Sequence, residues 1–95
     1  MNLLKKRIVV DTITQSRETF DVNGVVSFTV INRGAVDCTI AYQGGPALMT
    51  IEKGTAREFP GDSGYAFYGI MEINFKGADT GSVEVIKSTA STEES

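Results

Sequence analysis

The sequence predicts an all-β fold: a small antiparallel β-sandwich of seven or eight short strands, Ig-like or jelly-roll-like, with a small barrel as the alternative. Apolar and polar residues alternate along most of the 95-residue chain, and we find no amphipathic helical pattern of about ten residues. Turn-forming residues recur roughly every 8–12 residues, a spacing typical of sandwiches and barrels. A chain of this length forms one domain with a modest core.

The first half of the chain supplies an opening strand, a short second strand and a predicted hairpin. Residues 7–14 are rich in β-branched side chains, and residues 18–22 form the short strand. The runs VVSFTVIN and AVDCTIAY alternate cleanly, and Asn32-Arg33-Gly34 lies between them with Gly34 suited to a positive φ. Their predicted core faces hold Val26, Phe28 and Val30 in one strand, and Val36, Cys38, Ile40 and Tyr42 in the other.

The second half predicts three short β segments and a closing hairpin. LMTIE, REF and the aromatic run YAFYG come first. GIMEINFKG and SVEVIK follow, and the turn-rich residues 76–81 join them as a hairpin. Their predicted core faces hold Met71, Ile73 and Phe75 in one strand, and Val83 and Val85 in the other.

The two ends of the chain are polar and of opposite charge. We expect a single domain over residues 1–87 that begins with a short basic arm, residues 1–7. Residues 88–95 read STASTEES, a composition that cannot drive burial, and we interpret them as a polar tail.

Composition excludes several kinds of stabilising or catalytic centre. Cys38 is the only cysteine and there is no histidine, so neither an internal disulfide nor a His/Cys zinc site can form. We predict no cofactor and no metal. The net charge of −3 argues against nucleic acid and anionic membranes as partners. No run resembles a signal peptide, so we expect a protein that stays in the cell that makes it, or leaves inside an assembly.

The tetrapeptide GDSG at residues 61–64 surrounds the nucleophile of chymotrypsin-like proteases. A serine nucleophile needs a base with a pKa near 7, and without histidine Ser63 has none. We therefore interpret the run as a turn and predict no catalytic residue.

Ordinary structural roles explain the other candidate site residues better than chemistry or ligand binding does. Two of the carboxylates of Asp62, Asp79, Glu72 and Glu84 could in principle form a hydrolytic pair, but a solvated face explains them better. Asp62 and Asp79 could bind calcium together with loop carbonyls, but ordinary Asx-turns explain them better. The aromatic run offers a possible sugar-stacking platform at Tyr65 and Tyr68, whereas Phe59 and Phe67 are expected to fill the core.

The run FTVINRGAVDCTIAYQG followed by LMTIEKGTAREFPG resembles small β-sandwich proteins of tailed-phage virions over residues 25–86. The resemblance implies a non-enzymatic structural protein: a capsid decoration, stabilising or other accessory component that works through subunit contacts. We accordingly expect partners that are other protein subunits, in a homo-oligomer or with a capsid or tail protein, and assembly into a virion in the host cytoplasm. The alternative is a carbohydrate- or ligand-binding module. The predicted partner contacts are Lys5, Lys6, Arg7, Tyr65, Tyr68, Glu93 and Glu94.

Overall fold

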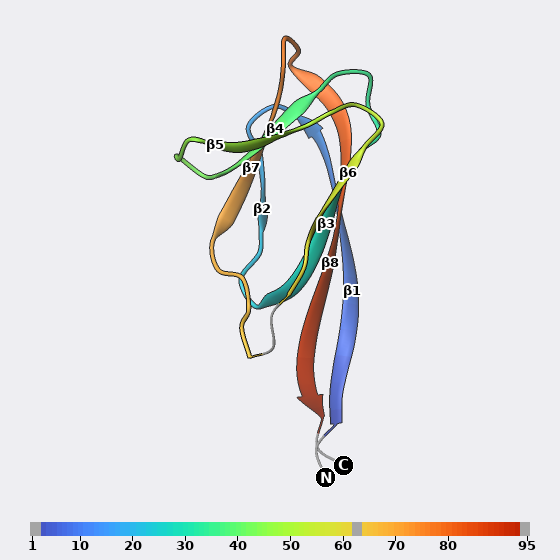
Figure 1. The fold of residues 1–95 in the computed structure, drawn as a ribbon, viewed down its shortest axis with the longest axis vertical. Coiled ribbons are helices and arrows are strands. Elements are labelled where there is room, and N and C mark those ends of the chain that lie inside the picture. The colour runs from blue at the N-terminus through green and yellow to red at the C-terminus, as the bar shows by residue number, and fades with distance from the viewer. Residues whose placement is uncertain (1–2, 62–63, 94–95) are drawn as a thin grey trace.

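The structure, a computed structural model, describes residues 3–61 and 64–93, with side chains for 7–61 and 64–89. All regular elements in these residues are strands, which confirms the all-β prediction (Figure 1). There are eight among them: β1 (Leu3–Gln15), β2 (Glu18–Asp21), β3 (Val25–Asn32), β4 (Cys38–Tyr42), β5 (Ala47–Ile51), β6 (Ala56–Phe59), β7 (Ile70–Phe75) and β8 (Thr80–Glu93).

The strands form two antiparallel four-stranded sheets, with orders β1-β8-β3-β6 and β2-β7-β4-β5. The first strand pairs with the last, the second with the seventh, the third with the sixth, and the fourth with the fifth. A long hairpin that is rolled up on itself produces this nested pairing, and it is the topology of a jelly roll. The structure therefore selects the jelly-roll form of the predicted sandwich over the Ig-like form, and the described strands do not close into a barrel.

Both hairpins predicted from the sequence are wrong, although their strands are correct. β3 and β4 lie in opposite sheets, as do β7 and β8. Of the strands that follow each other along the chain, only β4 and β5 pair directly. An alternating pattern reports that a segment is a strand with one buried face, but it carries no information about which strand lies beside it.

The connection from β3 to β4 is a corner between the sheets, organised by the buried amide of Asn32. Its Nδ2 donates to the carbonyl oxygens of Val36 (2.9 Å) and Ile51 (3.0 Å), and its Oδ1 accepts from the Gly34 N–H (3.1 Å). Gly34 does not have the positive φ that we predicted. It is required for space instead, because a Cβ there would lie 2.9 Å from the backbone nitrogen of Ser82.

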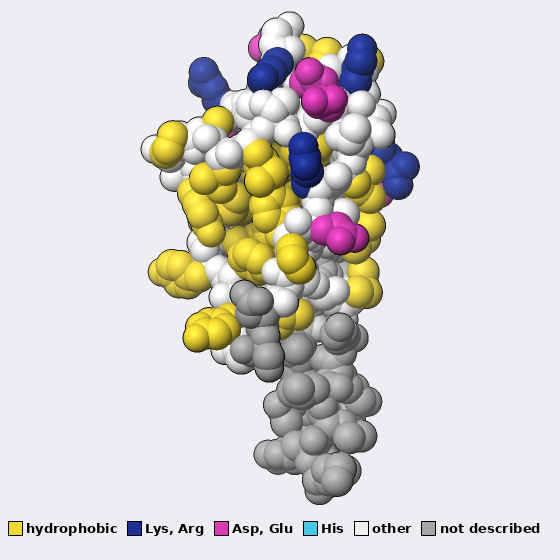
Figure 2. Space-filling view, viewed as in Figure 1, with side chains coloured by type: hydrophobic (Ala, Val, Ile, Leu, Met, Phe, Trp, Pro, Cys, Tyr) yellow, Lys and Arg dark blue, Asp and Glu magenta, His cyan; other side chains and the backbone are white. Residues whose placement is uncertain are grey.

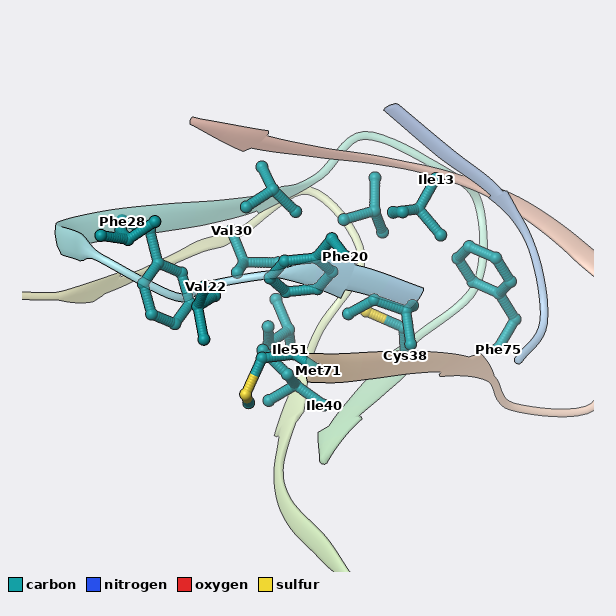
Figure 3. Packing of buried hydrophobic residues seen from close by; sticks show 14 residues of the cluster. Ile13, Phe20, Val22, Phe28, Val30, Cys38, Ile40, Ile51, Met71 and Phe75 are labelled. Atoms are coloured by element: carbon teal, nitrogen blue, oxygen red, sulfur yellow. The ribbon is translucent and has the colours of Figure 1, made fainter. Parts of the chain in front are cut away.

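The core lies between the two sheets, and its phase follows the predicted alternation (Figure 3). The expected residues of β7 and β8 are buried, and so are Phe28 and Val30 of β3. Of the expected residues around β4, Cys38 and Ile40 are buried and Val36 is partly buried. Val26 is an exception: a bulge between Val25 and Ser27 shifts the register of β3, so that Val25 is buried in its place. Tyr42 lies at the end of its strand and is largely exposed.

A buried lysine joins the two sheets near one end of the sandwich. Lys87 extends from β8, and its Nζ lies 2.6 Å from Asp11 Oδ2 on the neighbouring strand β1. The same Nζ donates to the Asp21 carbonyl oxygen at the end of β2 in the other sheet (2.9 Å). The Lys87 side chain is only 11% exposed and the Asp11 side chain is 35% exposed, so the lysine is buried while the carboxylate reaches solvent.

β1 and β8 are the longest strands, and together they continue past the sandwich as a two-stranded ribbon (Figure 1). Their register runs from Ile13↔Val83 to Leu3↔Glu93, whereas β3 accompanies β8 only as far as Thr89. Residues 3–7 of the expected basic arm are thus part of β1, and residues 1 and 2 lie outside the described residues. Residues 88–93 of the expected polar tail continue β8, because pairing with β1 satisfies their backbone groups without requiring buried side chains.

Candidate functional site

The GDSG run lies where the chain passes from β6 toward the aromatic loop. Asp62 and Ser63 are outside the described residues. Gly61 packs directly on β3, because a Cβ at this position would overlap the carbonyl oxygen of Val26. Gly64 has φ +84°, which favours glycine. Glycine is therefore needed on both sides of the pair, for space at position 61 and for the backbone conformation at position 64.

The aromatic run 65–68 is an irregular loop, and the predicted strand is wrong. Phe67 anchors it: its N–H donates to the Val25 carbonyl oxygen (2.7 Å), and its carbonyl accepts from Gly24 N–H (3.0 Å). The Phe67 ring packs edge-on against Phe28, 4.9 Å between centroids. Phe59 stacks on Phe28 from another side at 4.4 Å. Phe59 and Phe67 thus contribute to the core as predicted.

Anchoring through Phe67 leaves both neighbouring tyrosines in solvent. Tyr65 is 76% exposed and Tyr68 83% exposed. They do not form one platform, because they line two separate hollows. Tyr65 borders a hollow of about 90 Å³ with Pro60, Gly61 and Phe67. Tyr68 borders a hollow of about 330 Å³ whose other lining residues are Asn23, Tyr42, Gln43, Gly69 and Ile70.

The hollow beside Tyr68 is built by three turns of the chain. Asn23 lies between β2 and β3, and its Oδ1 accepts from the Gly69 N–H (2.7 Å). Gln43 follows β4, and its N–H donates to the Ile70 carbonyl oxygen (2.9 Å). A Cβ at Gly69 would lie 3.1 Å from the Tyr42 ring, so glycine allows the loop to approach that ring. None of Asn23, Tyr42 and Gln43 was predicted from the sequence as a contact residue, since only the fold brings them beside Tyr68.

The backbones of Lys5, Lys6, Arg7 and Glu93 lie together in the β1–β8 pair, although these residues come from opposite ends of the sequence. Lys5 pairs with Ser91 and Arg7 with Thr89 in the β1–β8 register, while Glu93 pairs with Leu3. The Arg7 side chain is exposed. The side chains of Lys5, Lys6 and Glu93, and all of Glu94, are outside the described part of the molecule.

Exposed apolar side chains form a further class of candidate contacts, of which only Tyr65 and Tyr68 were predicted from the sequence. In Figure 2 hydrophobic side chains gather over the middle of one face, and most charged side chains lie around its upper part. The described residues of this class are Ile8, Val10, Tyr42, Leu48, Met49, Tyr65, Tyr68 and Ile70. Ile8 and Val10 lie on β1, Leu48 and Met49 on the edge strand β5. The alternation within RIVVDT could have indicated the first pair.

The ionisable groups are dispersed. Glu72 on β7 and Glu84 on β8 lie in opposite sheets, so they do not occupy adjacent strands as expected, and Glu84 pairs with Arg33 at 2.8 Å. Among the described residues, no three Cys, Asp or Glu side chains are close enough to hold a metal ion. Burial, with a smaller contribution from Asp37, raises the pKa of the Cys38 thiol from 9.0 to about 11.

No protein-family model matches this chain, and no curated protein is significantly similar to it in sequence. Within the described residues, no helix is long and apolar enough to cross a membrane.

Proposed function

We propose that this protein is a non-enzymatic structural component of a phage virion, a capsid decoration, stabilising or other accessory protein that acts through subunit contacts. The observation that carries the proposal is the shape: a small jelly roll with a projecting two-stranded ribbon, 52 Å long and only 23 × 18 Å across. A molecule of this shape exposes a large area of strand edge and sheet surface relative to its volume. The sequence resemblance to tailed-phage sandwich proteins points the same way.

The distribution of exposed side chains also supports a contact role. Large apolar side chains are exposed on β1, on edge strand β5 and on the aromatic loop. Exposed apolar side chains that gather on one face, as in the middle of the face in Figure 2, mark surfaces that bind other proteins. The exposed strand edges offer backbone groups for pairing with a neighbouring chain.

Co-sedimentation with phage heads and tails tests this function. The protein is mixed with heads and tails purified from the phage whose structural genes flank its own, after its own gene has been deleted. We expect saturable binding at a fixed copy number, and a higher melting temperature of the particles if it stabilises them. Absence of binding to every head and tail component would refute the proposal.

A second function, recognition of a neutral sugar, is supported by the hollow beside Tyr68. Two tyrosine rings and two side-chain amides line it, and none of its lining residues carries a charged side chain. Tyrosine rings stack on the apolar face of a sugar, and amides exchange hydrogen bonds with its hydroxyls. A glycan array tests it with wild type and Tyr68→Ala. Tyr65→Ala is the matched control, because Tyr65 lines the other hollow. Binding that Tyr65→Ala removes and Tyr68→Ala retains would reject this site.

A further inference from the structure

The outer edge of β1 is the longest strand edge in the described structure that no neighbouring strand covers. β1 has 13 residues and lies at the end of its sheet. The three other edge strands are short: β2 and β6 have four residues each and β5 has five. Short edges are a common protection against unwanted pairing, whereas a long flat edge is a template for another strand. β1 is therefore the edge best suited to bind a strand.

The end of β1 nearest the β1–β2 turn is already occupied. Glu18 Oε1 accepts from the backbone N–H groups of Thr14 (3.1 Å) and Gln15 (3.2 Å). A partner strand would have to displace this carboxylate to pair there. The open part of the edge is thus residues 3–13.

We propose that two copies of this chain pair antiparallel through residues 5–13 of β1, about a two-fold axis that passes between the two Val9 residues. In this register Arg7 of each copy lies directly opposite Asp11 of the other. Arg7 is exposed, and Asp11 is still 35% exposed while it contacts Lys87. Opposite charges that face each other across an antiparallel pair stabilise it. The symmetry supplies this contact twice, as in isologous dimers.

The other face of the strand gives the same register an apolar contact. Ile8 of each copy lies opposite Val10 of the other, and these side chains are 60% and 53% exposed in the single chain. Ile86, which pairs with Val10 inside the chain, extends the apolar strip onto β8. Dimerisation would cover these side chains at the seam of a continuous eight-stranded sheet.

Neighbouring registers fit less well. Placing Ile8 on the axis sets Arg7 opposite Val9, although it brings the backbone of Lys5 opposite Asp11. Placing Val10 on the axis sets Asp11 opposite Val9. Offsets that pair odd with even positions put core-facing residues opposite solvent-facing ones. Only the Val9-centred register satisfies the charged and apolar positions among the described side chains.

This inference deepens the proposed function by naming one subunit contact, and it rests on that function only for its biological setting. A dimer that binds no head or tail component would keep the contact and refute the function. A monomer that binds head or tail components would support the function and refute the dimer contact.

Sedimentation velocity of the full chain over a concentration series tests the dimer. We expect concentration-dependent dimerisation of the wild type. Arg7→Glu and Ile8→Glu should each raise the dissociation constant at least about tenfold, because they place like charges, or a charge and an apolar group, across the seam. Leu48→Glu, an equivalent change on the exposed edge strand β5, should leave it unchanged. Circular dichroism confirms that each variant folds.

Cysteine cross-linking tests the register. Directly opposite Cα atoms lie about 4.5–5.5 Å apart, within disulfide range, whereas a two-residue offset exceeds about 7 Å. Under mild oxidation Val9→Cys should therefore form a disulfide-linked dimer, and Ile8→Cys and Val10→Cys should not. The native thiol does not interfere, since Cys38 is fully buried. A monomer at all concentrations, dimers insensitive to both glutamate substitutions, or cross-linking at position 8 or 10 in preference to 9 would overturn the proposal.

Discussion

Replacing Asn32 should destabilise the fold more than any other single polar substitution among the described residues. Its side chain is completely buried at the corner where the chain leaves β3 and crosses to the opposite sheet. It makes three hydrogen bonds, to Gly34 and Val36 in the corner and to Ile51 on β5. One amide therefore holds the corner and ties it to the other sheet.

The cost of Asn32→Ala follows from these three bonds. A net contribution of about 1 kcal/mol each gives about 3 kcal/mol, with more if the Ile51 carbonyl stays buried without a partner. At about 0.05–0.15 kcal/mol per residue, a domain of this size has a total stability of roughly 5–14 kcal/mol. The loss should lower the melting temperature by roughly 12–24 °C. Asn32→Asp keeps the volume but loses both donated bonds and buries a charge, so it should cost more.

Urea denaturation and thermal melting, both followed by circular dichroism, measure the effect. Asn74→Ala is the matched control, because Asn74 lies on the face of β7 opposite the buried Ile73 and Phe75, is only partly buried, and its side chain makes no hydrogen bond with another described residue. It should change stability by less than about 0.5 kcal/mol. A loss below about 1 kcal/mol for Asn32→Ala, or stability of Asn32→Asp equal to wild type, would refute this account of the corner.

Three further predictions concern the core. Phe28→Ala removes the ring that contacts Phe20, Phe59 and Phe67, and should cost about 3–5 kcal/mol in urea denaturation, unless the cluster collapses into the space. Lys87→Met breaks two bonds of a buried ammonium but leaves Asp11 able to hydrate, so a loss of about 1–2 kcal/mol is expected; a stabilised variant would contradict it. Because burial raises the pKa of Cys38 from 9.0 to about 11, the unfolded thiol ionises first, and the free energy of unfolding should fall as the pH rises through this interval. Cys38→Val should lack that part of the fall, and a thiol reagent at pH 8 should label the wild type only after denaturation.

Strand positions could be predicted from the sequence because the alternation of apolar and polar residues within each strand indicates which face is buried. VVSFTVIN coincides with β3, and the buried phase of Cys38 and Ile40 or of Met71 and Ile73 follows from alternation alone. Strand partners could not be predicted, since the choice between a hairpin and a crossing to the other sheet depends on contacts far apart in the sequence. The bulge at Val25 could not be predicted for a related reason: one extra residue reverses which side chains face the core without altering the composition.

The candidate contacts divide in the same way. Tyr65 and Tyr68 could be singled out as aromatic residues in a loop-rich region, and both are exposed. Their separation into two hollows depends on Phe67, whose backbone bonds to the β2–β3 turn pull the loop toward the core between them. The charge complementarity between Arg7 of one copy and Asp11 of another could not be predicted, because it depends on β1 lying at the edge of its sheet.

The pairing of the first strand with the last has a consequence for biosynthesis. β1 is the first strand to leave the ribosome, yet its pairing partner in the native sheet, β8, is the last to be made. The β1–β8–β3 part of the sheet therefore cannot form until β8 has been synthesised. Closing loops of this length is slow. Until then the apolar strands are exposed, so chaperone occupancy and expression temperature should influence the yield of native protein more than they do for a protein of similar size with local strand pairing.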